Sequence, residues 1–453
     1  MYDVGIIGAG PAGYVAALRC AQLGGSVILF EKENVGGVCL NKGCIPTKTL
    51  LGSIELVSSI RKAANYGIDV GSVSLNFAKM TERKKEVILK LRQGVAYLLS
   101  ARKVTLLQKE AKLLSPTQIE AAGERIECKN IIIASGSRPA LVPGIEFDGA
   151  GIISSDELIE ISSVPESLII VGGGVIGCEF ANIFCELGAK VTIVEMMPQL
   201  LPAEDREIAK NLEAALRKKG VDIFTKTKIT GVQKEDGQYR ALIGEGLSVS
   251  ASKILVATGR RPNLEGVGLE GAGVLFERKF IKVDSQLRTN LANVYAAGDV
   301  VGGYMLAHVA SYEAIIASEN IFGQSRSADY RFVPNCIYTD PEIASVGINE
   351  DKAKGENLAY NVAKFPFRAL GKAHAIGKEE GFVKLIVDKE GQKILGCQII
   401  GPHASDLIAE VTLACRCAIT PKELMETIHA HPTLSEAVAE AAHKASGSPV
   451  HMI

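Results

Sequence analysis

The sequence lacks an excess of charge of either sign. It contains 50 Lys and Arg residues against 51 Asp and Glu residues, which gives a net charge of -1. A general nucleic-acid binder or a polybasic membrane binder carries a pronounced basic excess, so the composition argues against both classes. We therefore expect no nucleic-acid partner.

Long hydrophobic runs are also missing. No apolar stretch approaches the roughly 18 residues that suggest a transmembrane helix, and the N-terminus shows no basic region followed by a signal-peptide core. We expect a cytoplasmic protein without a membrane partner, and an organellar protein that has lost its transit peptide remains an alternative. The 453 residues are 47% hydrophobic, which allows about three domains with a large core.

The ten cysteines show little sign of a structural disulfide network. Most are scattered within apolar segments and are typical of buried thiols in a reducing compartment. Cys39 and Cys44 differ, because a glycine-rich stretch precedes them and Pro46 and Lys48 follow closely. We predict a redox pair here and no metal site.

The same strand–turn–helix–strand unit occurs twice, about 164 residues apart. In each copy a glycine-rich turn follows an apolar strand, and a second strand ends in an acid 18 positions after the last glycine of the turn. The strands, turn and helix of the first copy are residues 4–7, 8–13, 14–23 and 27–30, ending at Glu31, and those of the second are 167–171, 172–177, 180–187 and 191–194, ending at Glu195.

Two complete copies of this pattern predict two dinucleotide-binding domains. The glycines let the backbone approach a pyrophosphate at a helix N-terminus, where free N–H groups and the helix dipole favour negative charge. The acid accepts hydrogen bonds from ribose hydroxyls. Glu195 would repel a 2′-phosphate, and Met196 and Met197 supply no cation to receive one, so the second site favours NAD over NADP.

The thiol pair has the surroundings of a reactive site. We expect Cys39 and Cys44 to flank the start of a helix that Pro46 opens. A thiolate near a helix N-terminus is stabilised, and Lys48 adds positive charge one turn later. A dithiol beside a nucleotide site indicates transfer of two electrons between a cofactor and a disulfide.

A histidine near the C-terminus offers a base for thiol chemistry. His431 is followed five positions later by Glu436, a carboxylate that can orient the imidazole. A histidine that is merely fixed before the turn at Pro432 is the alternative interpretation of this segment alone.

The remaining sequence completes the fold class. Residues 131–139 resemble residues 254–262, since each is a buried strand followed by a small-residue turn. Residues 77–101 predict a helix or helix pair, on which the basic run 83–85 indicates a solvated face. After about residue 335 the pattern becomes α+β, with a hairpin at 381–387 and 393–400 and helices at 404–418, 421–427 and 435–444. We predict an α/β protein with two Rossmann-like domains and a C-terminal α+β dimerisation domain.

Together these residues resemble the class I pyridine nucleotide–disulfide oxidoreductases along essentially the whole chain. The segments that carry the resemblance are Gly8-x-Gly10-x-x-Gly13, Gly37-x-Cys39-x4-Cys44-Ile45-Pro46-x-Lys48, Gly172-x-Gly174-x-x-Gly177-Cys178-Glu179, Ala257-Thr258-Gly259-Arg260-Arg261-Pro262-Asn263, Tyr295-Ala296-Ala297-Gly298-Asp299 and His431-Pro432-Thr433. The resemblance implies an FAD domain at 1–147, an NAD domain at 148–268, a return to the FAD domain at 269–334, a dimerisation domain at 335–453, and a homodimer.

The resemblance also implies roles for individual side chains. Cys39 would be the interchange thiol, and Cys44 would face the flavin as the charge-transfer thiolate. His431, oriented by Glu436, would be the acid–base group of the other subunit's site. Lys48 and Glu179 would pair beside the flavin's reactive nitrogen.

The cofactor contacts carried over from the family fall into two sets. One FAD per subunit would contact Gly8, Gly10, Pro11, Ala12, Gly13, Glu31, Lys32, Gly37, Val38, Cys39, Lys48, Ala111, Ser135, Gly136, Asp299, Met305, Leu306, Ala307 and His308. NAD would contact Gly172, Gly174, Val175, Ile176, Gly177, Glu179, Glu195, Ile229 and Gly259.

Within the family the chain most resembles the members that oxidise protein-bound dihydrolipoamide with NAD. Their partners would be lipoyl domains of 2-oxo acid dehydrogenase complexes or of the glycine-cleavage system. Lys42 between the redox cysteines and Thr47 after Pro46 depart from the commonest family pattern, and neither removes a required group.

Three alternatives stay open at this point. An NADPH-dependent reductase of glutathione or another small disulfide would want basic residues where Met196 and Met197 stand. A mercuric-ion reductase would want a cysteine pair near the C-terminus, whereas the last cysteine is Cys417. A peripheral, non-catalytic subunit of a large dehydrogenase complex is the third.

Overall fold

The computed structural model describes residues 1–452 except positions 236 and 245. The chain forms two compact units: Met1–Leu141, Ser154–Ser163 and Gly259–Asp329 form the first, and Val142–Ile153, Val164–Thr258 and Tyr330–Ile453 form the second. Among the described residues, no helix combines the length and the apolar character needed to span a bilayer.

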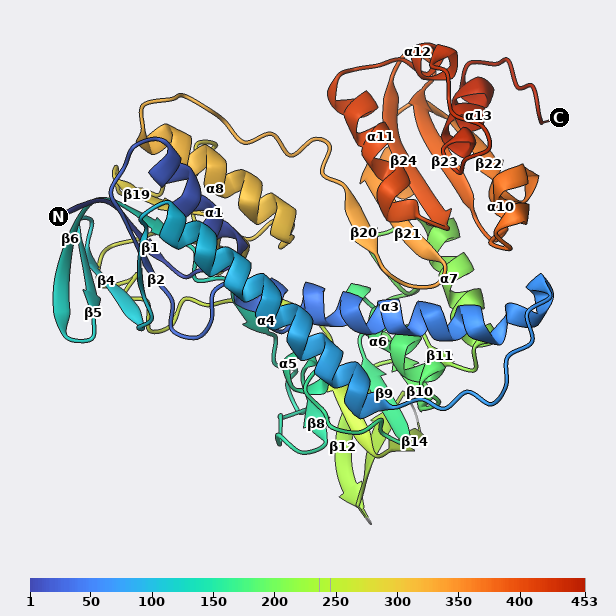
Figure 1. Cartoon of the computed structure of the whole chain (residues 1–453), viewed down its shortest axis with the longest axis horizontal. Coiled ribbons are helices and arrows are strands. Elements are labelled where there is room, and N and C mark those ends of the chain that lie inside the picture. Colours follow the sequence, from blue (N-terminus) through green and yellow to red (C-terminus); the bar gives the residue numbers. More distant parts are fainter. Residues whose placement is uncertain (236, 245, 453) are drawn as a thin grey trace. The chain divides into compact units, whose positions relative to one another are not determined.

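The first unit is built on a sheet with a parallel centre (Figure 1). Its strands are β1 (Tyr2–Ile7), β2 (Val27–Phe30), β3 (Thr105–Leu107), β4 (Ala111–Ser115), β5 (Gln118–Ala121), β6 (Glu124–Ile133), β7 (Ser137–Pro139), β16 (Arg260–Pro262), β17 (Phe276–Glu277), β18 (Phe280–Ile281) and β19 (Val294–Ala296). Its helices are α1 (Pro11–Gln22), α2 (Gly37–Asn41), α3 (Cys44–Arg61), α4 (Phe77–Ala101), α5 (Ser155–Leu158) and α8 (Ala307–Ile321), with 3-10 turns η1 (Ala63–Tyr66) and η2 (Asp299–Val301).

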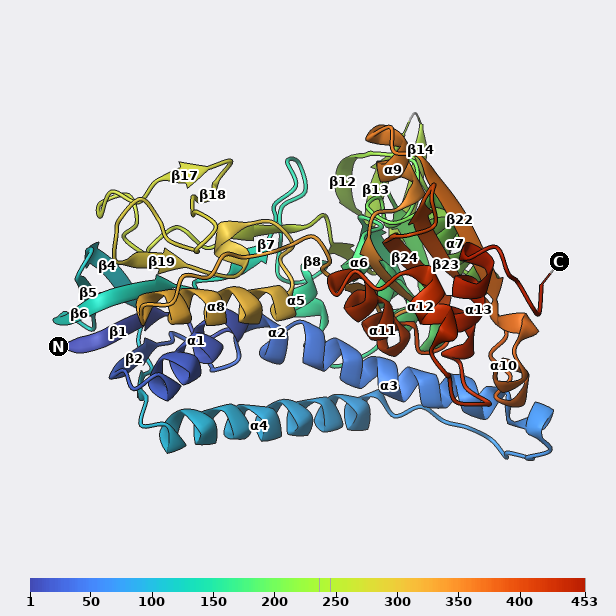
Figure 2. The ribbon, with the colours of Figure 1, turned by 90° about the horizontal axis from the view of Figure 1, so that it is seen from above.

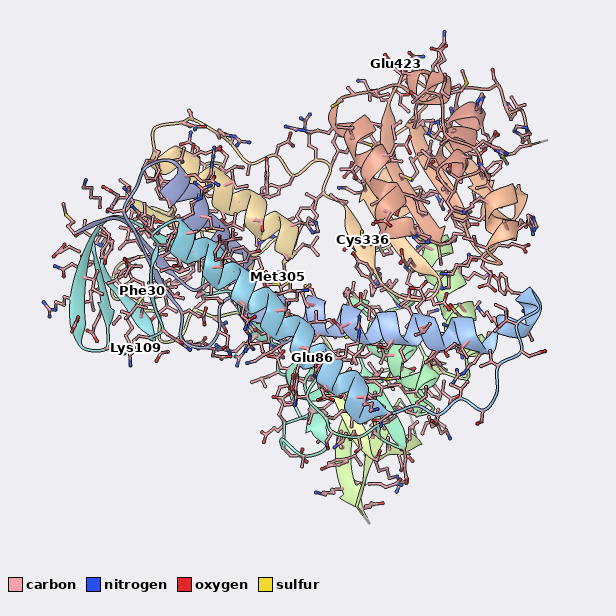
Figure 3. The ribbon with its side chains drawn as sticks, in the orientation of Figure 1. Phe30, Glu86, Lys109, Met305, Cys336 and Glu423 are labelled. Carbon is pink, nitrogen blue, oxygen red and sulfur yellow. The ribbon has the colours of Figure 1, made fainter. Side chains whose placement is uncertain are left out.

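The centre of this sheet is parallel, and its strand β2 is covered on both faces. Strands β3, β2, β1 and β6 lie side by side in that order, and β19 pairs with β6, all in parallel. Every residue of β2, including Phe30 (Figure 3), is buried, as a strand covered on both faces requires. The predicted strand–turn–helix–strand unit at the N-terminus is therefore confirmed.

Two pairs of helices pack in this unit. Helix α1 packs on α8, and the long helices α3 and α4 run beside each other (Figure 2). The prediction of a helix at 77–101 is confirmed, as one continuous helix. The solvated basic run was wrong at one position, because Lys84 is fully buried: its Nζ donates to the Ile159 carbonyl and, at 3.1 Å, to Glu160 Oε1.

The second unit contains a second parallel sheet and an antiparallel one. Its strands are β8 (Ile152–Ile153), β9 (Ser167–Val171), β10 (Lys190–Val194), β11 (Asp222–Phe224), β12 (Ile229–Glu235), β13 (Gln238–Ile243), β14 (Leu247–Ala251), β15 (Lys253–Val256), β20 (Asn335–Ile337), β21 (Glu342–Gly347), β22 (Tyr360–Pro366), β23 (Phe382–Asp388) and β24 (Ile394–Gly401). Its helices are α6 (Val175–Glu186), α7 (Arg206–Lys218), α9 (Glu350–Gly355), α10 (Gly371–Ala375), α11 (Ala404–Arg416), α12 (Pro421–Glu426) and α13 (Glu436–Ala445), with the 3-10 turn η3 (Phe367–Ala369).

The second parallel sheet repeats the strand order of the first. Strands β11, β10, β9, β15 and β8 are neighbours in that order, and all pairs are parallel. As in the first unit, the first strand of the repeated unit lies centrally, with its successor on one side and a later strand on the other. The predicted duplication is confirmed at the level of topology. The small antiparallel sheet β12–β13–β14 has no counterpart in our sequence analysis.

The C-terminal part is a five-stranded antiparallel sheet in the order β20, β21, β24, β23 and β22. The predicted hairpin is confirmed, because β23 and β24 pair antiparallel. Helices α11 and α13 pack on this sheet and close its hydrophobic core.

A buried lysine ties helix α7 to this sheet. Lys384, on β23, is 1% exposed, and its Nζ lies 2.7 Å from Asp205 Oδ1, 3.2 Å from Glu207 Oε2 and 3.0 Å from Glu350 Oε1. Asp205 also caps α7, since its Oδ1 accepts from the Glu207 and Ile208 amides. One cation thus satisfies carboxylates from two helices.

The two similar strand–turn segments pair with each other at their ends. Strand β7 runs antiparallel to β16, with Arg138 opposite Arg261. The Arg260 guanidinium donates from Nε to Ser137 Oγ at 2.8 Å and from Nη2 to the Ser137 carbonyl oxygen at 2.9 Å. The likeness of the two segments in sequence therefore corresponds to a two-stranded ribbon.

Candidate active site

The first glycine turn leaves no room for side chains at its ends. Gly8 has a φ of +98°, and a Cβ there would lie 2.3 Å from the Ala134 carbonyl oxygen. A Cβ on Gly13 would lie 1.7 Å from the Gly8 carbonyl oxygen. The second turn repeats both approaches: a Cβ on Gly172 would lie 2.6 Å from the Ala257 oxygen, and one on Gly177 would lie 2.0 Å from the Gly172 oxygen.

The middle glycine of each turn faces open space instead. A Cβ on Gly10 would meet only the Gly37 Cα, at 3.8 Å, and one on Gly174 would meet nothing within 4 Å. Each of these glycines directly precedes the helix that follows, α1 or α6. A space kept free beside exposed amides at a helix N-terminus fits a pyrophosphate, so the residues present suit a dinucleotide in both units.

The two acids at the strand ends make matching contacts. Glu31 accepts from the Ala9 amide at 2.8 Å with Oε2 and from the Glu33 amide at 2.8 Å with Oε1. Glu195 accepts from the Gly173 amide with Oε2 and from the Met197 amide with Oε1, both at 2.6 Å. Each oxygen keeps capacity for a further bond, so both carboxylates can still receive ribose hydroxyls.

The dithiol lies where the short helix α2 meets the start of the long helix α3. Cys39 is in α2, and Cys44 is the first residue of α3. Both are partly buried, and no disulfide bond links them in this structure. The expectation that Pro46 opens the helix was wrong by two residues, because α3 begins at Cys44 and Gly43 stands before it.

The two sulfurs interact directly. A hydrogen bond with Cys44, reinforced by burial, raises the pKa of Cys39 well above its ordinary value, and Lys48 works in the opposite direction. The expected lowering of thiol pKa therefore does not apply to Cys39 in the reduced pair.

The start of helix α2, which contains Cys39, packs against the first nucleotide turn. The Gly36 amide donates to the Ala9 carbonyl at 2.8 Å, and a Cβ on Gly37 would lie 2.5 Å from the Gly10 Cα. Gly37 and Val38 open α2, so the predicted FAD contacts in this segment lie beside the turn. The dithiol and the nucleotide turn therefore belong to one piece of packed backbone.

Two neighbours of the dithiol were missed by the sequence analysis. Asn41 is buried, and its Nδ2 donates to the Gly37 carbonyl at 2.7 Å and to the Val35 carbonyl at 3.1 Å. These bonds fix the segment that precedes Cys39. Tyr14, just after the turn, has a pKa raised by burial and then by nearby Cys39. The position of Tyr14 directly after Gly13 was the available signal.

Other predicted FAD residues surround the carboxyl ends of the parallel strands. Ser135 Oγ donates to the Asn263 carbonyl at 2.7 Å, and the Asn263 amide nitrogen donates to the Gly136 carbonyl at 2.9 Å. Asp299, at the start of η2, accepts a hydrogen bond from Ser137. The structure places the remaining predicted contacts as follows: Pro11 and Ala12 open α1, Lys32 follows Glu31, Lys48 is in α3, Ala111 begins β4, and Met305 (Figure 3), Leu306, Ala307 and His308 lie at the start of α8.

The predicted NAD residues belong mainly to the second unit. Val175 and Ile176 open α6, and Ile229 begins β12. Glu179 is buried on α6, where its Oε1 accepts from the Tyr338 amide at 3.0 Å. Gly259 belongs to the first unit. Because Lys48 and Glu179 are in different units, their pairing stays a prediction.

The histidine site is formed as predicted from its spacing. His431 Nδ1 lies 2.8 Å from Glu436 Oε1, and the Thr433 amide donates to Glu436 Oε2 at 2.8 Å. Although burial works against it, these bonds lower the pKa of Glu436. The His431 side chain is 77% exposed, so its other ring nitrogen is open to a substrate.

Comparison with known proteins covers nearly the whole chain. Residues 2–314 match the family model described as pyridine nucleotide-disulphide oxidoreductase, and residues 333–442 match the dimerisation domain of the same family. The chain belongs to the pyridine nucleotide–disulphide oxidoreductases. As a member of this family it is a flavoprotein disulfide oxidoreductase whose cofactors are FAD and NAD.

Two curated relatives within this family show similarity from end to end. A dihydrolipoyl dehydrogenase of Bacillus subtilis (strain 168) is 44% identical and covers 99% of both chains. One of Chlorobaculum tepidum is 43% identical, covering 98% of this chain and 97% of its own.

Solved structures of the family show the same fold. A crystal structure of LpdA from Mycobacterium tuberculosis has a TM-score of 0.92 at 29% identity, with 97% of this chain and 99% of that chain covered. The HOCl-induced flavoprotein disulfide reductase RclA from Escherichia coli has a TM-score of 0.87 at 30% identity, with 96% and 98% covered. The family membership and fold class predicted from the sequence are therefore confirmed.

Proposed function

We propose that the protein is a dihydrolipoyl dehydrogenase that oxidises protein-bound dihydrolipoamide to lipoamide with NAD as the electron acceptor. The observation that carries the proposal is the Cys39–Cys44 dithiol packed against a nucleotide turn. The end-to-end similarity to curated dihydrolipoyl dehydrogenases supports the choice of substrate.

In the proposed reaction the chain's own groups perform thiol–disulfide exchange. A dihydrolipoyl thiolate attacks Sγ of Cys39 in the oxidised pair, and Cys44 leaves as a thiolate. The second lipoyl thiol then attacks the lipoyl sulfur of the mixed disulfide and releases Cys39. When bound, FAD relays the resulting electron pair from the dithiol to NAD.

His431 supplies the proton transfer in this scheme. Its Nδ1 is engaged by Glu436, so Nε2 is the nitrogen that removes a proton from the attacking lipoyl thiol. Thiols with a reference pKa of about 8.5 are only slightly ionised at neutral pH, and such a base raises the thiolate fraction at the moment of attack.

The second nucleotide site supports NAD rather than NADP. Each oxygen of Glu195 accepts from one backbone amide and keeps capacity for a ribose hydroxyl, and the exposed side chains that follow are Met196 and Met197. Residues 195–199 thus supply a negative charge and no cation of their own, which disfavours a 2′-phosphate.

The proposed assembly is a homodimer in which His431 of one subunit serves the dithiol of the other. The match of residues 333–442 to the family's dimerisation domain supports the dimer. Lipoyl domains of a 2-oxo acid dehydrogenase complex or of the glycine-cleavage system are the proposed partners. The cytoplasmic location stays a prediction.

A paired steady-state assay on the purified flavoprotein tests the proposal. One reaction contains dihydrolipoamide and NAD, and the other contains glutathione disulfide and NADPH. We expect turnover in the first alone, with its loss in Cys39→Ser and Cys44→Ser variants that still bind FAD. Turnover in the second alone would assign the chain to the small-disulfide reductases, and wild-type activity in either cysteine variant would overturn the disulfide mechanism.

A further inference from the structure

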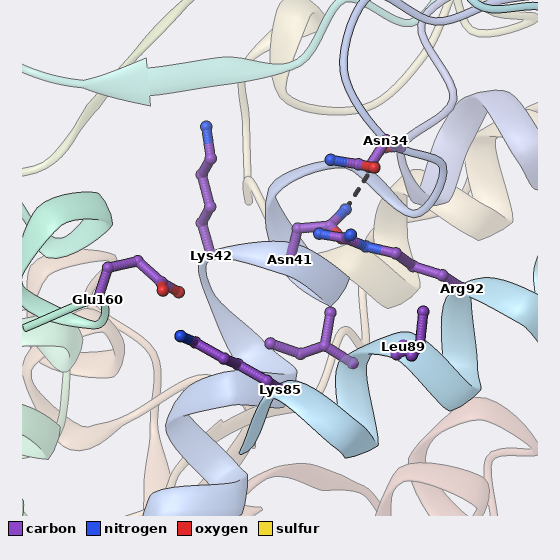
Figure 4. Close-up of a pocket in the computed structure, with 8 residues that line it drawn as sticks. Asn34, Asn41, Lys42, Lys85, Leu89, Arg92 and Glu160 are labelled. Carbon is purple, nitrogen blue, oxygen red and sulfur yellow. Dashed lines mark hydrogen bonds between the residues drawn. The ribbon is translucent and has the colours of Figure 1, made fainter. Parts of the chain in front are cut away.

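A pocket lined by three cations and one acid lies beside helix α2 in the first unit. It has a volume of ≈ 260 Å³, and its walls include Asn41 from α2, the following Lys42, Lys85, Leu89 and Arg92 from α4, and Glu160 (Figure 4). None of the predicted FAD or NAD contacts lines it. The pocket is therefore distinct from the predicted cofactor contacts, and Arg92 also borders a second hollow, which Glu31 lines.

The charges in this pocket do not cancel. The acid Glu160 is already paired with buried Lys84, at 3.1 Å, and Lys42 is paired with Glu33 at 2.8 Å. Lys85 makes no hydrogen bond or ion pair with any residue that the structure describes. Among the described residues, neither Lys85 nor Arg92 has a carboxylate within ion-pair distance, so both keep their charge available to a ligand.

Arg92 is oriented toward the pocket by a buried amide. Its Nε donates to Asn41 Oδ1, while Asn41 Nδ2 holds the Gly37 and Val35 carbonyls. In the part of the chain that the structure describes, no acceptor is bound to the terminal nitrogens of Arg92. A guanidinium held at Nε presents its other donors as a fixed fork, a geometry suited to phosphate oxygens.

We propose that this pocket binds a phosphate monoester. Lys85 and the Arg92 fork supply charge for the phosphate, and Leu89 offers an apolar wall to the organic part of the ligand. Inorganic phosphate shares the recognised chemistry. Because Asn41 joins Arg92 to the Gly37 carbonyl at the start of α2, the ligand also stabilises the loop before Cys39.

Calorimetric titration of the holoenzyme tests the proposal. Saturating NAD fills the second nucleotide site, and chloride holds the ionic strength constant, while inorganic phosphate and glycerol 3-phosphate are titrated separately. We expect one saturable site per subunit. Tighter binding of the ester identifies an organic phosphate as the ligand, and equal affinities identify inorganic phosphate. Absence of saturable binding by both anions would overturn the proposal.

Variants locate the binding to this pocket. Arg92→Gln should weaken it about tenfold or more, since it removes charged hydrogen bonds, whereas Lys90→Gln removes an exposed cation of the same helix outside the pocket and should leave it unchanged. If Arg92→Gln fails to fold, Lys85→Gln makes the same test at an exposed position. Undiminished binding in a folded pocket variant would overturn the assignment. The result is independent of lipoamide turnover.

Discussion

Glu436 fixes which nitrogen of His431 acts as a base. It holds Nδ1 at 2.8 Å and is itself held by the Thr433 amide. With the carboxylate replaced by an amide, the geometry is nearly kept, but the charge that stabilises the imidazolium is lost. The role of Glu436 is thus electrostatic as well as steric.

We predict that Glu436→Gln lowers kcat for dihydrolipoamide oxidation by about 10- to 100-fold, part of the roughly 10²–10⁴-fold that a positioned acid–base group supplies. Steady-state kinetics across pH measure it. Thr427→Val, at an exposed threonine outside the His431–Glu436 contacts, is the control. A variant with unchanged kcat and pH profile would contradict the role of the pair.

The pKa of Glu436 predicts the sign of an acid effect on stability. Burial opposes the effect, but His431 and the Thr433 amide lower the pKa of Glu436 in the folded protein. The ionised carboxylate therefore contributes stability at any pH above its unfolded-state pKa of about 4.5. This stability is lost as the pH falls through the lower pKa of the folded state. Urea unfolding of wild type between pH 7 and pH 3 should therefore show a decrease that is smaller in Glu436→Gln. An equal decrease in both proteins would contradict this linkage.

Spacing alone predicted the His431–Glu436 pair, because both residues lie in one short segment. It did not predict Asn41, whose Nδ2 holds the Val35 and Gly37 carbonyls and whose Oδ1 accepts from Arg92, 51 positions later. Similarly, the sequence predicted a solvated Lys84, whereas the structure shows it bonded to the distant residues 159 and 160. Local sequence identified residues that act with sequence neighbours and missed those completed by distant segments.

At the scale of elements, the strand–turn–helix units were predictable because their signal is both periodic and repeated. The start of α3 was not, because a helix can begin at Cys44 with Pro46 in its first turn, where proline loses no hydrogen bond. The sheet β12–β14 was also missed. Its strand β14 shows little burial, so its residues lack a clear alternation.

The glycines of the second turn predict two different phenotypes. Gly177→Ala should destabilise the protein, because the Cβ would lie 2.0 Å from the Gly172 carbonyl oxygen. Gly174→Ala should fold, because its Cβ meets nothing within 4 Å, but should weaken NAD binding at least about tenfold by entering the phosphate space. Thermal unfolding and NAD titration separate the two effects. Normal NAD affinity in Gly174→Ala would contradict the assignment of this space.

The buried Lys384 predicts a large effect from one side chain. Lys384→Met leaves the carboxylates of Asp205, Glu207 and Glu350 without their shared cation, so we expect unfolding free energy to fall by about 3–5 kcal/mol. Chemical denaturation measures it. Lys389→Met, at an exposed position just after the same strand, should change stability by no more than about 0.5 kcal/mol. Similar small effects in both variants would show that the cluster is not a stabilising contact.

At the scale of the whole molecule, complementation between two inactive variants can test whether His431 serves the dithiol of the other subunit. Cys39→Ser and His431→Ala each inactivate a homodimer. In a heterodimer of one Cys39→Ser subunit and one His431→Ala subunit, one of the two shared sites combines an intact Cys39 with an intact His431. Activity should therefore recover to about half of wild type. Co-expression with two affinity tags and sequential purification provides this heterodimer. If His431 served the dithiol of its own subunit, the heterodimer would stay inactive.

The contacts of Glu31 and Glu195 have a consequence for re-engineering cofactor preference. Each acid accepts from one amide within its glycine turn and from one amide two residues after itself. The carboxylate proposed to bind the ribose therefore also holds the phosphate-binding turn in place. A change of Glu195 made to admit NADP would release the Gly173 and Met197 amides together. A successful switch to NADP therefore requires a new acceptor for those two amides, and variants lacking one should lose affinity for both nucleotides.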